Sequence, residues 1–269
     1  MGVAIFLVVL YHSGIKLFYI GFIGVDIFLF LSGYRLCGSY ERQKTLGVFY
    51  KKRLLRILPL FSVLAICHSI INFIKNDCSF FDFVCNITTL SYYNLGGHIF
   101  DWYLCALVLF YFAFPILYYL VKKCPIGVLA ATLTGSLVLL TLGLPWYYDT
   151  AIGRIPIFTL GIICFSTSIN RKILYEALGL FGGAFVTTVL LYYLDLVHTY
   201  VLIYILAPFV FYVIAVLSAK IVSSLTKLSK AMEYLGSHSL ELYVSNNISM
   251  VIAGLILPPP LPRSLDILF

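Results

Sequence analysis

The chain has 269 residues, of which 62% are hydrophobic, 17% aromatic and only 11% charged. Soluble domains are about 45–50% apolar and about 25% charged, so this composition excludes a water-soluble globule and a disordered chain. The net charge of +7 does not indicate nucleic-acid binding, because Lys and Arg in a membrane protein mainly encode its orientation. The composition predicts an all-α protein that forms a polytopic transmembrane helix bundle.

Nine apolar stretches approach the length of about 20 residues that a helix needs to cross a bilayer. They predict about nine spans in a single domain over residues 1–269. Gly179 and Gly183 form a GxxxG step in the seventh stretch, which predicts close helix packing within the bundle. The nine stretches are residues 2–15, 18–36, 54–73, 102–121, 126–144, 151–169, 173–194, 199–219 and 239–257.

The basic residues follow a one-sided pattern along these stretches. A cytoplasmic N-terminus places all of them in cytoplasmic segments except Lys16, Lys75, Arg154 and Arg263. This distribution obeys the positive-inside rule. We therefore expect a multi-pass protein of the plasma (inner) membrane, surrounded by lipid, with its N-terminus in the cytoplasm.

The longest predicted outer loop, residues 74–101, contains Cys78 and Cys85. Two alternatives stay open for these thiols, a disulfide on the oxidising side or two free cysteines. Asn86 begins a glycosylation sequon, a triplet that is common by chance. The seven cysteines of the chain lack CxxC spacing, so no metal site is expected.

Two ionisable residues lie in the first predicted hairpin, where lipid makes them costly and therefore candidates for function. His12 follows an apolar run and can accept a proton near neutral pH; the alternative is a histidine at the outer interface, bonded to a carbonyl. Asp26 lies inside the second stretch and needs a partner there. That partner is either His12 or a basic residue, and the alternative is a protonated, structural carboxyl group.

Three more charged residues are candidates. Arg53 and Arg56 open the third stretch with i, i+3 spacing, which places both guanidinium groups near one helical face. Such a pair can bind a phosphate in a fork, and the alternative is simple positive-inside anchoring. Arg154 at the start of the sixth stretch and Glu241 at the start of the last one either bind substrate or extend to an interface.

Several segments together resemble acyltransferase family 3, the integral-membrane O-acyltransferases of bacterial surface glycans. The resemblance covers most of the chain, and the ordered set of segments is more specific than any one of them. The segments are AIFLVVLYH (4–12), GFIGVDIFLFLSGY (21–34), RLLRILPLF (53–61), Trp102-Tyr103-Leu104 with Tyr111 and Pro115, and Leu235-Gly236 with SLELY (239–243).

The resemblance implies transfer of an acyl group, usually acetyl, from cytoplasmic acyl-CoA to a sugar hydroxyl. It implies that His12 is the catalytic histidine and that Arg53 and Arg56 bind the phosphates of the donor. We expect Asp26 to support His12, and we expect Trp102, Arg154 and Glu241 to bind substrate. Acetyl-CoA or another acyl-CoA is expected as a donor substrate rather than a resident cofactor, and a glycan as the acceptor.

The sequence departs from the family at three places. Met1 occupies the position of an Arg that usually precedes the catalytic histidine by eleven residues. Asn246 and Asn247 stand near the place of a late histidine, and nine spans are counted where the family has ten. A chain that begins late or a truncated copy accounts for these departures. An inactive homologue or a transporter-like protein is therefore the alternative to an active enzyme.

Overall fold

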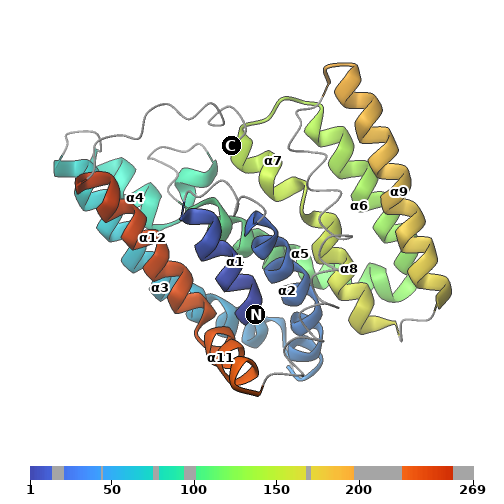
Figure 1. Ribbon diagram of the computed structural model, residues 1–269, viewed down its shortest axis with the longest axis horizontal. Helices are drawn as coiled ribbons and strands as arrows, with labels where there is room; N and C mark the ends of the chain where they lie inside the picture. The colour runs from blue at the N-terminus through green and yellow to red at the C-terminus, as the bar shows by residue number, and fades with distance from the viewer. Residues whose placement is uncertain are drawn as a thin grey trace. The chain divides into compact units, whose positions relative to one another are not determined.

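The computed structural model describes residues 1–13, 21–43, 45–74, 79–93, 101–167, 171–196 and 226–256. Every regular element in these ranges is helical, which confirms the all-α prediction (Figure 1). The elements are α1 (Gly2–His12), α2 (Ile23–Glu41), α3 (Leu46–Ile74), α4 (Phe80–Ile87), η2 (Leu90–Tyr93), α5 (Trp102–Lys123), α6 (Pro125–Leu140), α7 (Trp146–Ile152), α8 (Ile155–Ser166), α9 (Arg171–Tyr193), α11 (Thr226–Ser237) and α12 (Ser239–Ile256).

Four segments within the described ranges are long and apolar enough to cross a membrane. The predicted count of nine spans is therefore not confirmed. α1 and α6 are apolar but shorter, and α2 contains Asp26 and Arg35, which lower its mean hydropathy. The predicted stretch 199–219 lies outside the described residues. The four segments are α3, α5, Trp146–Ser166 (α7 with α8) and Tyr175–Tyr193 within α9.

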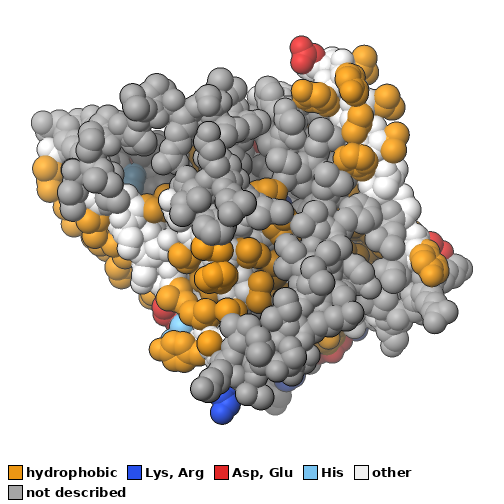
Figure 2. All heavy atoms as spheres, in the orientation of Figure 1, with side chains coloured by type: hydrophobic (Ala, Val, Ile, Leu, Met, Phe, Trp, Pro, Cys, Tyr) orange, Lys and Arg blue, Asp and Glu red, His pale blue; other side chains and the backbone are white. Residues whose placement is uncertain are grey.

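Large apolar side chains are exposed along these helices. Leu55 on α3, Ile116 on α5 and Leu190 on α9 are 60%, 65% and 59% exposed. Figure 2 shows such side chains gathered over α9. Soluble monomers rarely expose apolar patches of this extent, whereas lipid covers them at little cost. The surface therefore agrees with a multi-pass membrane protein.

The described chain divides into two compact units, and one of the boundaries between them lies inside α5, after Phe112. Unit 1 is built from the described parts of Met1–Arg42 and Ala113–Ser239, and unit 2 from those of Gln43–Phe112 and the chain from Leu240. Unit 1 thus contains α1, α2, the second half of α5, α6–α9 and α11. Unit 2 contains α3, α4, η2, the first half of α5 and α12.

Backbone contact joins α2 to α8 in unit 1. A Cβ atom on Gly33 would overlap the carbonyl oxygen of Phe158, and a Cβ atom on Gly161 would overlap that of Phe30. Small residues at a crossing allow this approach between membrane helices. The two helices run parallel, because Asp26 meets Arg154 near both starts and Gly38 meets Phe165 near both ends.

The helices α1 and α2 pack in the opposite sense. Gly21 contacts Leu7 of α1. Gly24, three residues later, contacts Ala4, which lies three residues earlier on α1. The pair is therefore an antiparallel hairpin. The relative directions of α1, α2 and α8 are those of the first, second and sixth members of an alternating series of spans.

A polar cluster joins the ends of α2 and α5 within unit 1. The Tyr118 hydroxyl donates a hydrogen bond to Glu41 Oε1, and Lys122 Nζ lies 3.3 Å from the same oxygen. The hydrogen bond from Tyr118 lowers the pKa of the Glu41 carboxyl. Because the Lys122 and Glu41 side chains are 52% and 46% exposed, their ion pair contributes little to stability. The Tyr40 ring packs edge-on against Tyr118 beside it.

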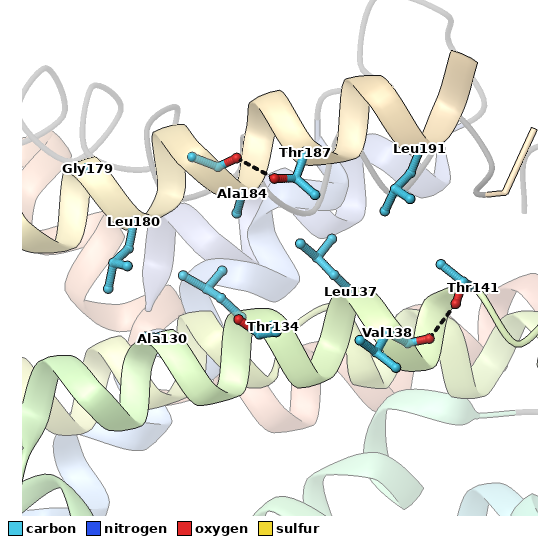
Figure 3. Close-up of a pocket in the computed structure, with 12 residues that line it drawn as sticks. Ala130, Thr134, Leu137, Val138, Thr141, Gly179, Leu180, Ala184, Thr187 and Leu191 are labelled. Atoms are coloured by element: carbon cyan, nitrogen blue, oxygen red, sulfur yellow. Dashed lines mark hydrogen bonds between the residues drawn. The ribbon is translucent and has the colours of Figure 1, made fainter. Parts of the chain in front are cut away.

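Gly179 and Gly183 of α9 do not form the predicted close packing. A Cβ atom added at either glycine would meet nothing within 4 Å. Both line a cavity of about 510 Å³ between α6 and α9, which Figure 3 shows with Thr134, Leu137 and Thr187 around it. The GxxxG spacing is present, but among the described residues no neighbouring helix packs closely against it. Tight glycine contacts of unit 1 occur elsewhere, among them those of Gly33 and Gly161.

In unit 2, α4 begins at a capping box and packs on α3. The Ser79 hydroxyl accepts from the Asp82 N–H while Asp82 accepts from the Ser79 N–H, which satisfies two free donors of the first turn. Asn86 Nδ2 donates to Ser69 Oγ at 3.0 Å, and both side chains are fully buried. The sequon at Asn86 is therefore closed to modification in the folded protein. Cys85 is buried on α4, and Cys78 lies outside the described residues.

The α2–α8 contact predicts unequal effects of glycine substitutions. Gly161→Ala should lower the free energy of unfolding by about 1–3 kcal/mol, because the added methyl group forces the two backbones apart. Gly183→Ala is the matched control and should leave stability unchanged or slightly raised, since open space surrounds it. Thermal unfolding of the detergent-purified variants measures both. Equal losses in the two variants would contradict the predicted contact.

Candidate functional site

A buried ion pair lies at the centre of unit 1. Arg154 Nε is 2.9 Å from Asp26 Oδ1, and the two side chains are only 4% and 0% exposed. Asp26 lies in the first turn of α2, where a negative charge also interacts favourably with the helix dipole. Arg154 is the residue that precedes α8. The pair therefore joins the starts of two parallel helices.

A second contact orients the Arg154 side chain. Its Nη1 donates to the carbonyl oxygen of Thr150 on α7 at 3.0 Å. Asp149, next to Thr150, is another buried carboxylate, only 2% exposed. Isolated charges cost several kcal/mol each in a low-dielectric interior, and pairing offsets that cost only with good geometry. Among the buried side chains of the described residues, Arg154 is the one basic member.

The structure thus assigns Asp26 a basic partner that the first hairpin does not contain. Of the two sequence-based choices for that partner, His12 or a basic residue, the ion pair selects Arg154. Arg154 does not extend to an interface, because it is 3% exposed and paired; that alternative is wrong. The arginine and aspartate, separated by 128 positions in the chain, are brought together by the α2–α8 crossing.

His12 is the last residue of α1 and is half-buried. Its ring centroid lies 5.3 Å from that of Tyr11. Gly24 packs against Ala4 at the other end of α1. Eight residues of helix, about 12 Å, separate Ala4 from His12. A direct role of Asp26 in supporting His12 stays a prediction, whereas its contact with Arg154 is observed.

In unit 2, Arg53 and Arg56 have different surroundings. Arg53 lies on α3 in one row with Phe49 and Ile57, which are 1% and 2% exposed. Its guanidinium carbon is 6.0 Å from the Phe49 ring centroid, a cation–π distance. Arg56 points about 60° around the helix from Arg53 and is exposed. One guanidinium is therefore positioned by packing, and the other is accessible.

A row of tyrosines on α5 leads away from these arginines. The Tyr111 hydroxyl is within electrostatic range of both guanidinium groups. Tyr103, two turns earlier on the same helical face, interacts electrostatically with Tyr111 and with Asp101. Both tyrosines are 7% exposed. Unit 2 thus contains a polar seam that begins at the exposed Arg56 and the half-buried Arg53 and continues through three buried residues, Tyr111, Tyr103 and Asp101.

The seam ends at the Asp101 carboxylate, which caps α5. Asp101 Oδ1 accepts from the Leu104 N–H at 2.8 Å and from the Tyr243 hydroxyl at 3.2 Å. Oδ2 accepts from Asn247 Nδ2 at 2.9 Å. Burial raises the pKa of the Asp101 carboxyl to about 6, against the lowering effect of these donors. The carboxylate therefore binds α12 to the start of α5.

The two other predicted substrate-binding residues of unit 2 flank this cluster along the chain. Trp102 begins α5 directly after Asp101 and is half-buried. Glu241 lies in the first turn of α12 and is exposed. No group of three metal-ligating side chains occurs in the part of the chain that the structure describes.

Comparison with known protein families shows to which family the chain belongs. A family model described as an acyltransferase domain, that of acyltransferase family 3, matches residues 2–268, essentially the whole chain. The chain belongs to acyltransferase family 3. This confirms the resemblance that the ordered segments predicted, and it supports a membrane acyltransferase as the general activity. No curated protein and no solved structure matches the chain.

The sequence did not single out every polar group that the structure places in this acyltransferase. Asp149 and Asp101 were missed. The available signal was the same in both cases: an acidic residue inside or beside an apolar, aromatic run, WYYDTAI and DWYLCAL. Such a residue is costly in lipid unless it is paired, so both positions could have been flagged as candidates without a partner being named.

The ion pair predicts non-additive effects on stability. Asp26→Leu or Arg154→Met alone should lower the unfolding free energy by about 3–5 kcal/mol, because each leaves an uncompensated buried charge. The double variant should be less destabilised than either single one. Chemical unfolding of the purified variants measures the three unfolding free energies. Lys122→Ala, which removes an exposed ion pair, is the control and should lower the unfolding free energy by no more than about 1 kcal/mol. Additive losses would contradict the pairing.

Proposed function

We propose that this protein is an O-acyltransferase that moves an acyl group, most simply acetyl, from cytoplasmic acyl-CoA to a hydroxyl of a cell-surface polysaccharide or its lipid-linked precursor. The observation that carries the proposal is the family match over residues 2–268, with His12, Arg53 and Arg56 at the positions of the family's segments. The protein acts from the plasma membrane with its N-terminus in the cytoplasm.

The donor binds through its phosphates to the arginines of α3. Arg53 is positioned by its contact with Phe49, so little side-chain entropy is lost when it binds an anion. Arg56 is accessible to solvent and can complete a two-point contact. The polar seam supports this assignment, because buried polar side chains in a membrane helix are retained mainly where they contribute to function.

The chemistry is assigned to His12. The neutral imidazole removes the proton from the acceptor hydroxyl while the oxygen attacks the thioester carbonyl carbon. The new C–O bond forms, the C–S bond breaks, and the imidazolium proton passes to the departing thiolate of CoA. A covalent relay of the acyl group through the ring is the second form of the same proposal. Asp26 and Arg154 act as positioning residues for the elements of unit 1.

His12→Ala should reduce acyl transfer by at least about 10²-fold, the usual contribution of a general base, and leave the protein in the membrane. Mass spectrometry of the surface polysaccharide from cells producing each variant measures the acylation. His238→Ala is the matched control, since this exposed histidine lies at the end of α11. Unchanged acylation in His12→Ala would reject the role of His12 as the catalytic group.

Arg56→Ala should weaken acyl-CoA binding about 10-fold or more, because a charge-assisted contact contributes about 1.5–3 kcal/mol. Arg53→Lys should also weaken it, since a lysine cannot reproduce a two-point guanidinium contact. Calorimetric titration of the purified variants with acetyl-CoA measures both, and Lys51→Ala is the control for an exposed basic residue of the same helix. Equal affinity in all variants would reduce both arginines to orientation signals.

A further inference from the structure

The Asp101 carboxylate is saturated with donors, and this determines what it can do. A carboxylate offers about four lone-pair sites. The Leu104 N–H, the Tyr243 hydroxyl and the Asn247 amide already donate to it, and the Tyr103 N–H also interacts with it. Asp101 is therefore a positioning residue rather than a ligand-binding group. What it positions is Asn247 on α12.

Two half-buried residues belong to the surroundings of this carboxylate in unit 2, Asn247 as its hydrogen-bond donor and Trp102 as its neighbour in the chain. Asn247 uses its amide nitrogen on Asp101, and its side chain remains partly exposed. Trp102, the next residue after Asp101, is also partly exposed, and its ring packs edge-on against Tyr103 at 6.0 Å. Tyr103 in turn contacts the Tyr243 ring at 5.2 Å. Both partly exposed side chains are thus attached to the Asp101 cluster, Asn247 by its hydrogen bond and Trp102 by its contact with Tyr103.

The cluster lies at the start of α5, the helix that also carries Tyr111, which is within electrostatic range of the predicted donor site on α3. Ten residues of α5 separate Asp101 from Tyr111, the tyrosine beside Arg53 and Arg56, which is about 15 Å of helix axis. The extended pantetheine arm of an acyl-CoA spans a distance of this order. The length of the seam therefore matches the distance between the phosphates and the thioester of such a donor.

We infer that Asn247, which Asp101 holds in place, and Trp102, which packs on Tyr103, form a subsite for a sugar ring of the acceptor. The indole offers a flat apolar face to the C–H groups of the ring, and the amide offers a donor and an acceptor to its hydroxyls, the combination that polar ligands require of a mostly apolar site. The inference rests on the proposed acyl transfer and adds the place and chemistry of acceptor recognition.

The chain itself supplies the reporter for the test. It contains two tryptophans, Trp102 and Trp146, and Trp146 lies in unit 1 at the start of α7. Trp146→Phe leaves Trp102 as the sole fluorophore. The full-length variant in lipid nanodiscs is titrated with octyl glycosides of glucose, galactose and N-acetylglucosamine, and with octyl phosphocholine as the control for the alkyl chain.

At least one glycoside should change the Trp102 fluorescence with saturation, and octyl phosphocholine should not. Adding Asn247→Ala should weaken that glycoside about 5- to 10-fold, the loss expected for one or two hydrogen bonds. Adding Asn246→Ala, the neighbouring amide, should not. Asp101→Asn should weaken the glycoside without changing acetyl-CoA affinity, and its effect should not add to that of Asn247→Ala.

The outcomes separate this inference from the proposed function. Fluorescence that responds equally to phosphocholine and glycosides, or to no glycoside, overturns the subsite while acetyl-CoA binding and the His12→Ala result are unaffected. Equal glycoside affinity in Asn247→Ala and Asn246→Ala also overturns it. If Asn247→Ala does not fold, the titration of Trp146→Phe alone decides, because a subsite at Trp102 requires a selective glycoside response. Loss of acetyl-CoA binding in the parent protein would instead count against the proposed function.

Discussion

The ion pair between Asp26 and Arg154 is the interaction on which the arrangement of unit 1 depends. Lipid offers no solvation to a charge, so each ionisable side chain in the apolar helices needs a partner from the same chain. The pair satisfies this need at one point only, where the starts of α2 and α8 meet. A shift of one residue along the crossing would separate the two charges, so the pair specifies the register of the helices as well as their proximity.

Close backbone packing makes this register available. Gly33 and Gly161 allow α2 and α8 to touch along their backbones, and dispersion contacts rather than the hydrophobic effect hold membrane helices together. Gly179 and Gly183 show the converse, since these two glycines have the GxxxG spacing and yet line an open cavity. A small residue permits a close crossing, but only the shape of the neighbouring helix determines whether one forms.

Unit 2 applies the same constraint to a longer polar network. Its polar groups lie within electrostatic range of one another from Arg53 through Tyr111 and Tyr103 to Asp101. Hydrogen bonds from Tyr243 and Asn247 to Asp101 attach α12. The proposed function gives a reason to keep such a costly network, because a donor with several phosphates and a polyhydroxylated acceptor would both need polar contacts within a membrane protein. The proposed donor and acceptor positions lie at its two ends.

Local physics allowed the sequence alone to determine the class of this protein. Its apolar content indicates membrane helices, and the ordered segments around His12, Arg53 and Trp102 indicate acyltransferase family 3, because those signals depend on neighbours in the chain. The partners of Asp26 and Asp101 could not be deduced from the sequence, because Arg154 and Asn247 are 128 and 146 positions away from the carboxylates they contact. The open surroundings of Gly179 and Gly183 could not be deduced either, because they depend on where the neighbouring helices lie. Only the tertiary structure decides which of many distant polar residues meet, since that choice depends on the crossing of helices and not on the spacing of residues within them.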